Sequence, residues 1–287
     1  MEDAIIADKL TYNYDKLVAV DHIDFKVKKG EILSFLGPNG AGKTTTVKIL
    51  TGQLRPREGK AFLLGMDVVH ETEKVQARIG VCFEVTNLYE QMSGEENLIL
   101  FARLFGVHGF DAGSILSRVG LDGRGKDRVE TYSKGMKQRL MVARSLVNQP
   151  DILFLDEPTE GLDPVSSETI RNVILEERQR GATVFLTTHD MVEADKLSDR
   201  VAFIDRGKIA ALDTPRNLKQ QYGKRAIKAE VVGEDGRLET KEIILDQPET
   251  ADEVRDLFYQ EQVATIHSEE ATLEDIFIRI TGRGLAG

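Results

Sequence analysis

The sequence predicts an α/β fold with a parallel sheet, followed by a small α+β appendage. Between residues 150 and 212, three short apolar strands at 152–155, 183–187 and 201–204 are separated by stretches with helical patterns. Strands that alternate with helices favour a parallel sheet with crossover helices. A second observation is a strand, a glycine-rich turn and a helix in direct succession over residues 31–50.

A third observation is a shift in charge near the C-terminus. From Lys224 to the end the chain has 8 basic and 15 acidic residues, which accounts for −7 of the total net charge of −10. Such a shift indicates a domain boundary near Tyr222–Gly223. We therefore expect one domain over residues 1–222 and a small acidic α+β domain over residues 223–287.

The first elements can be read from their apolar spacing. Apolar residues alternate over 23–27, which is typical of a half-buried, antiparallel strand. Residues 31–36 (EILSFL) are more continuously apolar and end in the glycine-rich turn. The segment 43–50 then reads as a helix that Gly52 closes.

The middle of the chain, about 84–149, is mostly helical in pattern and interrupts the alternation, so we expect a separate helical lobe. Ser93-Gly94-Glu95-Glu96 has the form of a capping box, and a second helix begins near Lys134. Asp163-Pro164 combines a favourable N-cap with a proline at the first helical position.

The acidic tail has a pattern of its own. Segments 227–232 and 238–245 flank Gly233-Glu234-Asp235-Gly236, which predicts a hairpin. A helix around Val254–Phe258, a strand at 263–266 and a last helix capped by Thr272 complete the α+β prediction.

Composition excludes several classes of protein. The 287 residues suffice for a large core, and the longest apolar run is residues 98–102, far short of the ~20 residues of a spanning helix. The net charge of −10 argues against nucleic acid as a partner. The single cysteine, Cys82, cannot form an internal disulfide, which suits a reducing cytoplasm.

The glycine-rich turn carries the strongest chemical signal. Its residues fit G-x-x-x-x-G-K-[ST] in full: Gly37, Pro38, Asn39, Gly40, Ala41, Gly42, Lys43 and Thr44, with Thr45 beside them. Glycines let backbone N–H groups face a phosphate, and the helix that follows adds its positive end. The lysine supplies charge to the β- and γ-phosphates, and the Thr44 hydroxyl is placed to bind Mg²⁺.

Two carboxylates end the apolar strand at 152–155. Because parallel strands deliver their last residues to the ligand-binding edge of a sheet, Asp156 is a candidate Mg²⁺ ligand and Glu157 a candidate general base. His189 follows the next strand in the same way and is a candidate γ-phosphate contact. The alternatives are an ordinary strand that ends in solvated acids and a histidine that merely caps a strand.

A second anion site is predicted at the helix that begins near Lys134, where Ser133 and Gly135 stand at the helix N-terminus. One chain with one phosphate loop has little use for a second site. A second copy of the chain would use it well.

The order of these pieces resembles the ATP-binding subunit of ABC transporters over about residues 4–220. The pieces are the phosphate loop, YSKGMKQR, ILFLDEP, Gly161-Leu162-Asp163 and Thr188-His189. The resemblance implies a P-loop NTPase with a RecA-like core, an antiparallel β lobe and a helical lobe. It also implies a head-to-tail dimer that holds two ATP molecules.

The resemblance also implies roles for single residues. Ser133 and Gly135 of one chain would contact the γ-phosphate held by Lys43 of the other, and Asp163 would be the residue that crosses the dimer. Tyr14 matches the aromatic residue that stacks on adenine, with Tyr12 as the alternative.

Two departures from the family pattern stand out. The usual LSGGQ signature reads YSKGM here. Where the family has a lid glutamine, this chain offers Glu84, a carboxylate that brings negative charge toward phosphates unless it binds Mg²⁺.

The tail motif Thr272–Phe277 and the segment 88–98 resemble single-cassette ATPases of drug and antibiotic efflux. The resemblance thus implies an ATPase that powers an exporter at the cytoplasmic face of the membrane, attached only through separate transmembrane permease subunits. Tyr89 and Leu98 are candidates for the permease contact. An importer ATPase and a non-transport ABC ATPase stay open as alternatives.

Overall fold

The computed structural model describes residues 2–223, 225–232, 237–245 and 247–284. The chain divides into two compact units between Asp213 and Thr214. This division falls before the predicted boundary at 222–223 because α8 (Pro215–Tyr222) packs against α10 (Leu273–Thr281). Arg279 Nη1 also donates a hydrogen bond to the carbonyl oxygen of Tyr222, at 2.6 Å.

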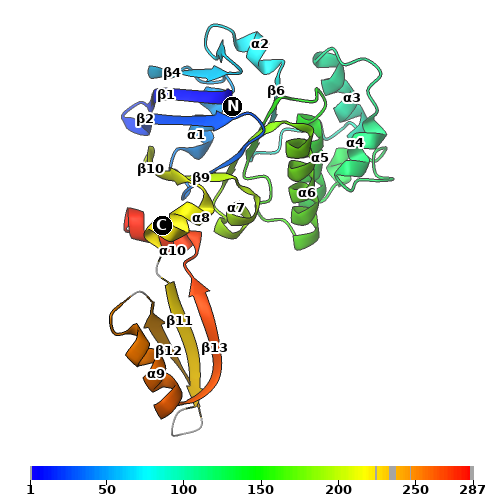
Figure 1. Ribbon diagram of the computed structural model, residues 1–287. Coiled ribbons are helices and arrows are strands. Elements are labelled where there is room, and N and C mark those ends of the chain that lie inside the picture. Colours follow the sequence, from blue (N-terminus) through cyan, green and yellow to red (C-terminus); the bar gives the residue numbers. More distant parts are fainter. Residues whose placement is uncertain (1, 224, 233–236, 246, 285–287) are drawn as a thin grey trace. The chain divides into compact units, whose positions relative to one another are not determined.

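A six-stranded sheet forms the centre of the first unit (Figure 1). Its strand order is β10-β9-β3-β8-β7-β6, and all neighbours from β9 to β6 pair in parallel. The strands are β3 (Ile32–Leu36), β6 (Ile79–Cys82), β7 (Ile152–Asp156), β8 (Thr183–Thr188), β9 (Arg200–Asp205) and β10 (Lys208–Asp213). The predicted parallel sheet is therefore confirmed, while β10 pairs with β9 in the antiparallel sense.

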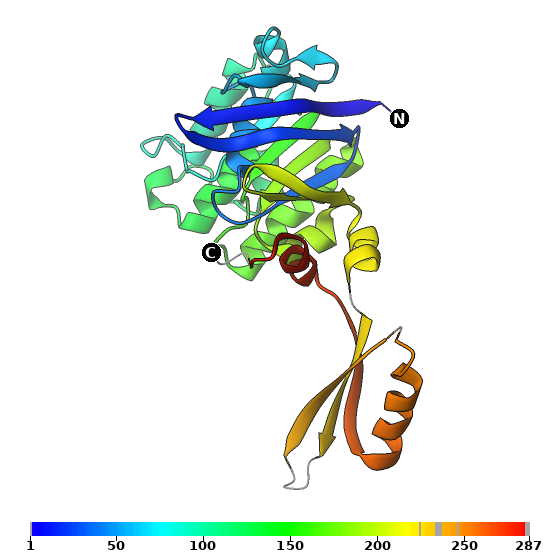
Figure 2. The same ribbon diagram turned by 90° about the vertical axis from the view of Figure 1, so that its left-hand side faces the viewer.

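A second, antiparallel sheet has the order β2-β1-β4-β5, and its two long strands are plain in Figure 2. Its strands are β1 (Asp3–Tyr14), β2 (Leu17–Lys28), β4 (Glu58–Leu63) and β5 (Met66–Asp67). The two sheets share a core in which the ring of Phe25 lies 5.1 Å from that of Phe35 and 5.8 Å from that of Phe185. Burial of these aromatic rings anchors the phosphate-loop strand β3 from the side of β2.

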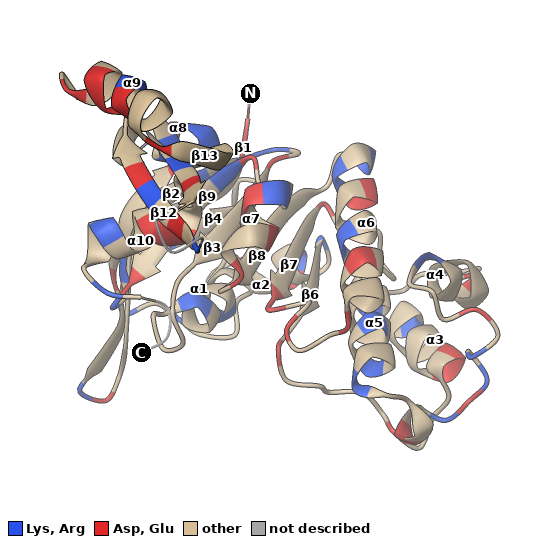
Figure 3. Ribbon diagram, turned by 90° about the horizontal axis from the view of Figure 1, so that it is seen from below, with Lys and Arg blue, Asp and Glu red and all other residues tan. Residues whose placement is uncertain are grey.

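Helices complete the first unit. They are α1 (Lys43–Leu50), α2 (Thr72–Gln76), α3 (Gly94–Leu104), α4 (Ala112–Arg118), α5 (Lys134–Ser145), α6 (Pro164–Arg180) and α7 (Met191–Leu197), with a short 3₁₀ turn at Val129–Thr131. The predicted capping box at α3 is present: Ser93 Oγ accepts from Glu96 N at 3.2 Å, and Glu96 Oε2 accepts from Ser93 N at 2.7 Å. Acidic and basic residues alternate along α6 (Figure 3).

The second unit contains a three-stranded antiparallel sheet in the order β12-β11-β13. Its elements after α8 are β11 (Arg225–Val232), β12 (Leu238–Ile244), α9 (Thr250–Gln260), β13 (Gln262–Glu270) and α10. Strands β11 and β12 pair as predicted, and the predicted turn at 233–236 lies outside the described residues. Thr272 caps α10 as expected.

The core of this sheet and α9 is small, with Ala229, Val231, Ile243 and Leu257 buried in it. In the part of the chain that the structure describes, no helix has the length and apolar character needed to span a membrane.

Candidate active site

The phosphate loop joins β3 to α1, and close backbone contacts fix its path. A Cβ at Gly37 would lie 2.2 Å from the carbonyl oxygen of Ile204, and one at Gly42 would lie 2.4 Å from that of Ala19. Gly42 also has a φ of 110°, which favours glycine. Any side chain at these two positions would displace the loop, so the glycine spacing reflects packing against β9 and β2.

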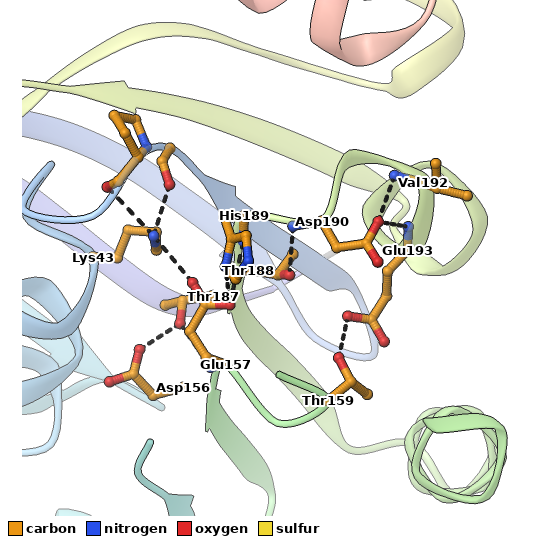
Figure 4. A network of polar contacts seen from close by, with 12 residues as sticks. Lys43, Asp156, Glu157, Thr159, Thr187, Thr188, His189, Asp190, Val192 and Glu193 are labelled. Atoms are coloured by element: carbon orange, nitrogen blue, oxygen red, sulfur yellow. Dashed lines mark hydrogen bonds and ion pairs between the residues drawn. The ribbon is translucent and has the colours of Figure 1, made fainter. Parts of the chain in front are cut away.

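Lys43 is the first residue of α1, and its side chain folds back over the loop (Figure 4). Its Nζ donates a hydrogen bond to the carbonyl oxygen of Gly37 at 2.7 Å and a longer one to that of Pro38 at 3.4 Å. The same Nζ lies 3.0 Å from Glu157 Oε1, forming a buried ion pair. This arrangement holds a positive charge at the mouth of the loop.

Asp156 is fully buried at the end of β7. Its Oδ1 accepts a hydrogen bond from Thr187 Oγ1 of the neighbouring strand β8, whereas its Oδ2 is buried without a hydrogen-bond partner. Burial raises the pKa of Asp156, and the hydroxyl groups of Thr187 and Thr44 act in the opposite direction. A buried carboxylate oxygen without a partner suits a cation ligand better than an ordinary structural position.

Glu157 and His189 meet beside Asp156. Glu157 Oε2 lies 3.0 Å from His189 Nδ1 and accepts the backbone N–H of His189 at 3.3 Å. The backbone N–H of Glu157 is bound by Thr187, whose Oγ1 accepts it at 3.2 Å. Glu157 has a φ of 49°, a left-handed conformation that is strained for a residue with a side chain.

A pocket of about 410 Å³ lies over the loop and collects most of the predicted nucleotide residues. Tyr14 lines it with 42% of its surface exposed, whereas Tyr12 packs against the core, so Tyr14 is the better placed of the two for stacking. The pocket lining comprises Tyr14, Leu17, Val18, Ala19, Pro38, Asn39, Gly40, Gly42, Lys43, Thr44, Thr45, Glu84 and Glu157.

Glu84 is exposed on the wall of this pocket. Burial of part of its carboxyl group raises its pKa, and the negative charges of Glu160, Asp156 and Glu157 raise it further. The positive charge of Lys43 acts in the opposite direction and lowers the pKa of Glu84. The four carboxylates and Lys43 therefore form one electrostatic group.

The three residues expected to serve a second chain lie elsewhere in this unit. Ser133 caps α5 by accepting the backbone N–H of Met136 at 3.2 Å, and Asp163 caps α6 by accepting that of Ser166 at 2.9 Å. A Cβ at Gly135 would lie 3.7 Å from Asp163 Oδ2. The structure thus brings Ser133, Gly135 and Asp163 together, and none of them is among the residues that line the Lys43 pocket.

Thr187 was not among the predicted site residues, although its hydroxyl contacts both Asp156 and Glu157. The signal was present in the pairing of Asp156 with Thr187 across β7 and β8, but it needs the strand order. Three further residues that were not predicted line the pocket after Tyr14: Leu17, Val18 and Ala19.

A divalent cation fits this donor set only together with oxygens from a ligand. Among residues of the described ranges, no group of three or more His, Cys, Asp or Glu side chains could hold a metal by itself. Asp156 Oδ2 is buried without a hydrogen-bond partner, and the Thr44 hydroxyl lies near enough to Asp156 to lower its pKa. Two such oxygens suit Mg²⁺, because it usually keeps waters and substrate phosphates as further ligands.

The parallel sheet, the loop and the paired carboxylates define a nucleotide-binding ATPase of the phosphate-loop class. Residues 20–160 match the ABC transporter family. A fluoroquinolones export ATP-binding protein of Mycobacterium tuberculosis is 45% identical over 278 residues, which cover 96% of this chain and 92% of that protein. The chain therefore belongs to the ATP-binding proteins of the ABC transporter family, as the sequence predicts.

Two further likenesses agree with this assignment. A daunorubicin/doxorubicin resistance ATP-binding protein of Streptomyces peucetius is 39% identical over 246 residues, covering 84% of this chain and 74% of that protein. The solved dimeric structure of a bacterial ABC transporter cassette superposes with a TM-score of 0.67 at 26% identity, covering 73% of this chain and 98% of that chain. The predicted fold class is confirmed.

Proposed function

We propose that this chain hydrolyses ATP and powers an exporter through separate transmembrane permease subunits, bound to them at the cytoplasmic face of the membrane. The observation that carries the proposal is the contact chain Lys43–Glu157–His189 beside a pocket lined by the phosphate loop. In this proposal Lys43 supplies the charge that binds phosphate, and Glu157, its partner in the ion pair, is the base that activates water.

ATP binding follows from the loop. The backbone N–H groups between Gly37 and Lys43 and the N-terminus of α1 would bind the phosphates, with Thr45 beside them. Lys43 would exchange its contact with Glu157 for phosphate oxygens, since both are anionic partners for one ammonium group. Tyr14 would stack on the adenine.

Hydrolysis follows from the carboxylates. Glu157 would accept a proton from the attacking water, and His189 contacts Glu157 Oε2 with both its backbone N–H and its ring Nδ1. Asp156, Thr44 and Glu84 would hold Mg²⁺, which neutralises charge on the phosphates when it is bound.

The remaining site residues favour a dimer. Ser133, Gly135 and Asp163 form one group outside the Lys43 pocket, at the N-termini of α5 and α6, and so would serve the nucleotide of a second copy. The relative solved as a dimer supports this arrangement. In this proposal residues 1–222 form the ATP-binding domain, and the acidic residues 223–287 form an appendage.

The names of the two relatives, an export protein and a drug-resistance protein, favour export over import. We test direction and partners together by solubilising membranes and purifying the full chain with whatever it binds. A co-purifying integral membrane protein without a solute-binding protein supports the exporter. A solute-binding protein in the complex favours an importer ATPase, and recovery with ribosomes or DNA favours a non-transport ABC ATPase.

A further inference from the structure

A buried carboxylate that the proposed reaction does not use lies one helical turn after His189. Glu193 is only 4% exposed, on α7, the helix that begins directly after His189 and Asp190. Asp190 Oδ1 accepts the backbone N–H groups of Val192 at 2.9 Å and Glu193 at 3.0 Å (Figure 4). The start of α7 is thus fixed, and the side chain of Glu193 is directed toward the segment after β7.

The partners of Glu193 are few for a buried charge. Its Oε2 accepts a hydrogen bond from Thr159 Oγ1 at 2.6 Å, while its Oε1 has no hydrogen-bond partner and lies 3.6 Å from Arg171 Nε on α6. Burial raises the pKa of Glu193, and the charge of Asp190 raises it further. A buried carboxylate destabilises the fold unless its contacts offset the cost of desolvation. A purely structural role therefore does not explain why this position holds a glutamate.

The hydrogen bond between Thr159 and Glu193 joins the loop after β7 to the start of α7. Thr159 stands in the loop that leads from Glu157 to Asp163, the cap of α6. Glu157 binds His189, and two residues later Thr159 binds Glu193, four residues after His189. The same two segments are therefore linked twice, and a pocket of about 220 Å³ lies between them.

We propose that Glu193 is a positioning residue that, through Thr159, fixes the loop 157–163 against the helix behind His189. This rests on the proposed function. The bridge holds the carboxylate of Glu157 and the imidazole of His189 in contact while the loop carries Asp163 toward a second chain. Loss of the bridge leaves the phosphate loop intact, so ATP binding is retained while turnover falls.

The test uses the full chain with Thr159→Val, Thr159→Ser, Glu193→Ala and Glu193→Gln. Thr159→Val and Glu193→Ala each lower kcat about tenfold, since small misplacements of catalytic groups are costly, and KM for ATP stays within about twofold. Thr159→Ser restores the hydroxyl donor and keeps kcat near wild type, and Glu193→Gln retains more activity than Glu193→Ala. The double variant Thr159→Val/Glu193→Ala loses no more than the worse single variant, because both remove one bridge.

Glu168→Gln is the matched control, because exposed Glu168 is the other carboxylate that pairs with Arg171. It leaves kcat unchanged. Losses in Thr159→Val and Glu193→Ala that add in the double variant, kcat values that stay at wild type, or an equal loss in Glu168→Gln overturn the proposal. If Glu193→Ala does not fold, the Thr159→Val and Thr159→Ser pair decides.

Hydrogen exchange of the same proteins separates this inference from the proposed function. Amide exchange in residues 157–163 rises in Thr159→Val and Glu193→Ala but not in Glu168→Gln, whether or not ATP is turned over. A wild-type chain that binds ATP without hydrolysing it overturns the proposed function, while unchanged exchange in the two bridge variants overturns the bridge.

Discussion

At the scale of single residues, the site is governed by competition for Lys43. Its ammonium group lies within 3.0 Å of both Glu157 and the carbonyl oxygen of Gly37. In the proposed function, a phosphate that enters the loop would replace the carboxylate, and the released carboxylate would accept a proton from water. We therefore assign phosphate binding to Lys43 and hydrolysis to Glu157, the two partners of one ion pair.

Lys43→Ala and Glu157→Gln should separate these two functions. Lys43→Ala removes the charge that binds phosphate, so we expect MgATP binding to be lost. Glu157→Gln removes a competing anion, so we expect affinity to be kept or improved while kcat falls about 10²–10⁴-fold with the general base. Equilibrium binding of a fluorescent ATP analogue and phosphate release measure the two effects. Comparable loss of affinity in both variants would contradict the assignment.

Asp156→Asn should stabilise the protein in a pH-dependent way. Burial raises the pKa of Asp156, so the folded chain binds this proton more tightly than the unfolded chain. The ionised carboxylate therefore costs stability as the pH rises from the unfolded-state pKa through the folded-state pKa. Without Mg²⁺, the variant should gain most in Tm near pH 8, with a smaller gain near pH 5, both values being approximate. A gain that is independent of pH would show that charge is not the cause.

Glu84→Gln tests the carboxylate that we expect at the position of the family's lid glutamine. If Glu84 helps to hold Mg²⁺, the variant needs more Mg²⁺ for half-maximal ATPase activity but still turns over, because the amide restores the usual group. Titrating the rate against Mg²⁺ for both proteins is the measurement. Superimposable curves would remove Glu84 from the metal site.

At the scale of helices and strands, the features that could be predicted from the sequence are those that depend on neighbouring residues in the chain. The helix expected at 43–50 has the same bounds as α1, and the expected caps of α3 and α6 are present. Caps and apolar periodicity depend on neighbours in the chain, so one sequence suffices to find them.

Long-range pairing explains what was missed. The strand order β3-β8-β7 brings Thr187 beside Asp156. The residues next to Thr187 in the sequence do not indicate this contact. Similarly, the role proposed for Glu193 depends on its hydrogen bond with Thr159, which lies on a separate segment of the chain.

Local patterns also did not show which of the two candidate permease contacts lies at the surface. Tyr89 is 52% exposed, whereas Leu98 is fully buried in the core beneath the helical lobe. Leu98 is therefore not a surface contact, because packing against neighbouring helices decides which apolar residue stays outside.

Tyr89→Ala and Leu98→Ala should differ accordingly. Tyr89→Ala keeps the ATPase activity of the isolated chain and impairs transport by the reconstituted complex. Leu98→Ala, the structural control, lowers stability by about 2–5 kcal/mol through a core cavity. Thermal unfolding, ATPase rates and transport assays compare them. Equal loss of ATPase activity and transport in Tyr89→Ala would assign that residue to folding.

At the scale of the whole molecule, the proposed function gives one chain two half-sites. The first is the Lys43 pocket, and the second is the group formed by Ser133, Gly135 and Asp163. We infer that two chains pair head to tail, so that each pocket meets the second group of the other copy.

The most direct test is the mass of the Glu157→Gln chain in solution, measured by size-exclusion chromatography with light scattering. Without ATP we expect the 32.0 kDa of a single chain. With ATP the mass should double, because phosphate joins the two half-sites and hydrolysis no longer separates them. Lys43→Ala/Glu157→Gln, which cannot bind ATP, should stay at the single-chain mass. A Glu157→Gln chain that binds ATP and still keeps the mass of one chain would contradict the account.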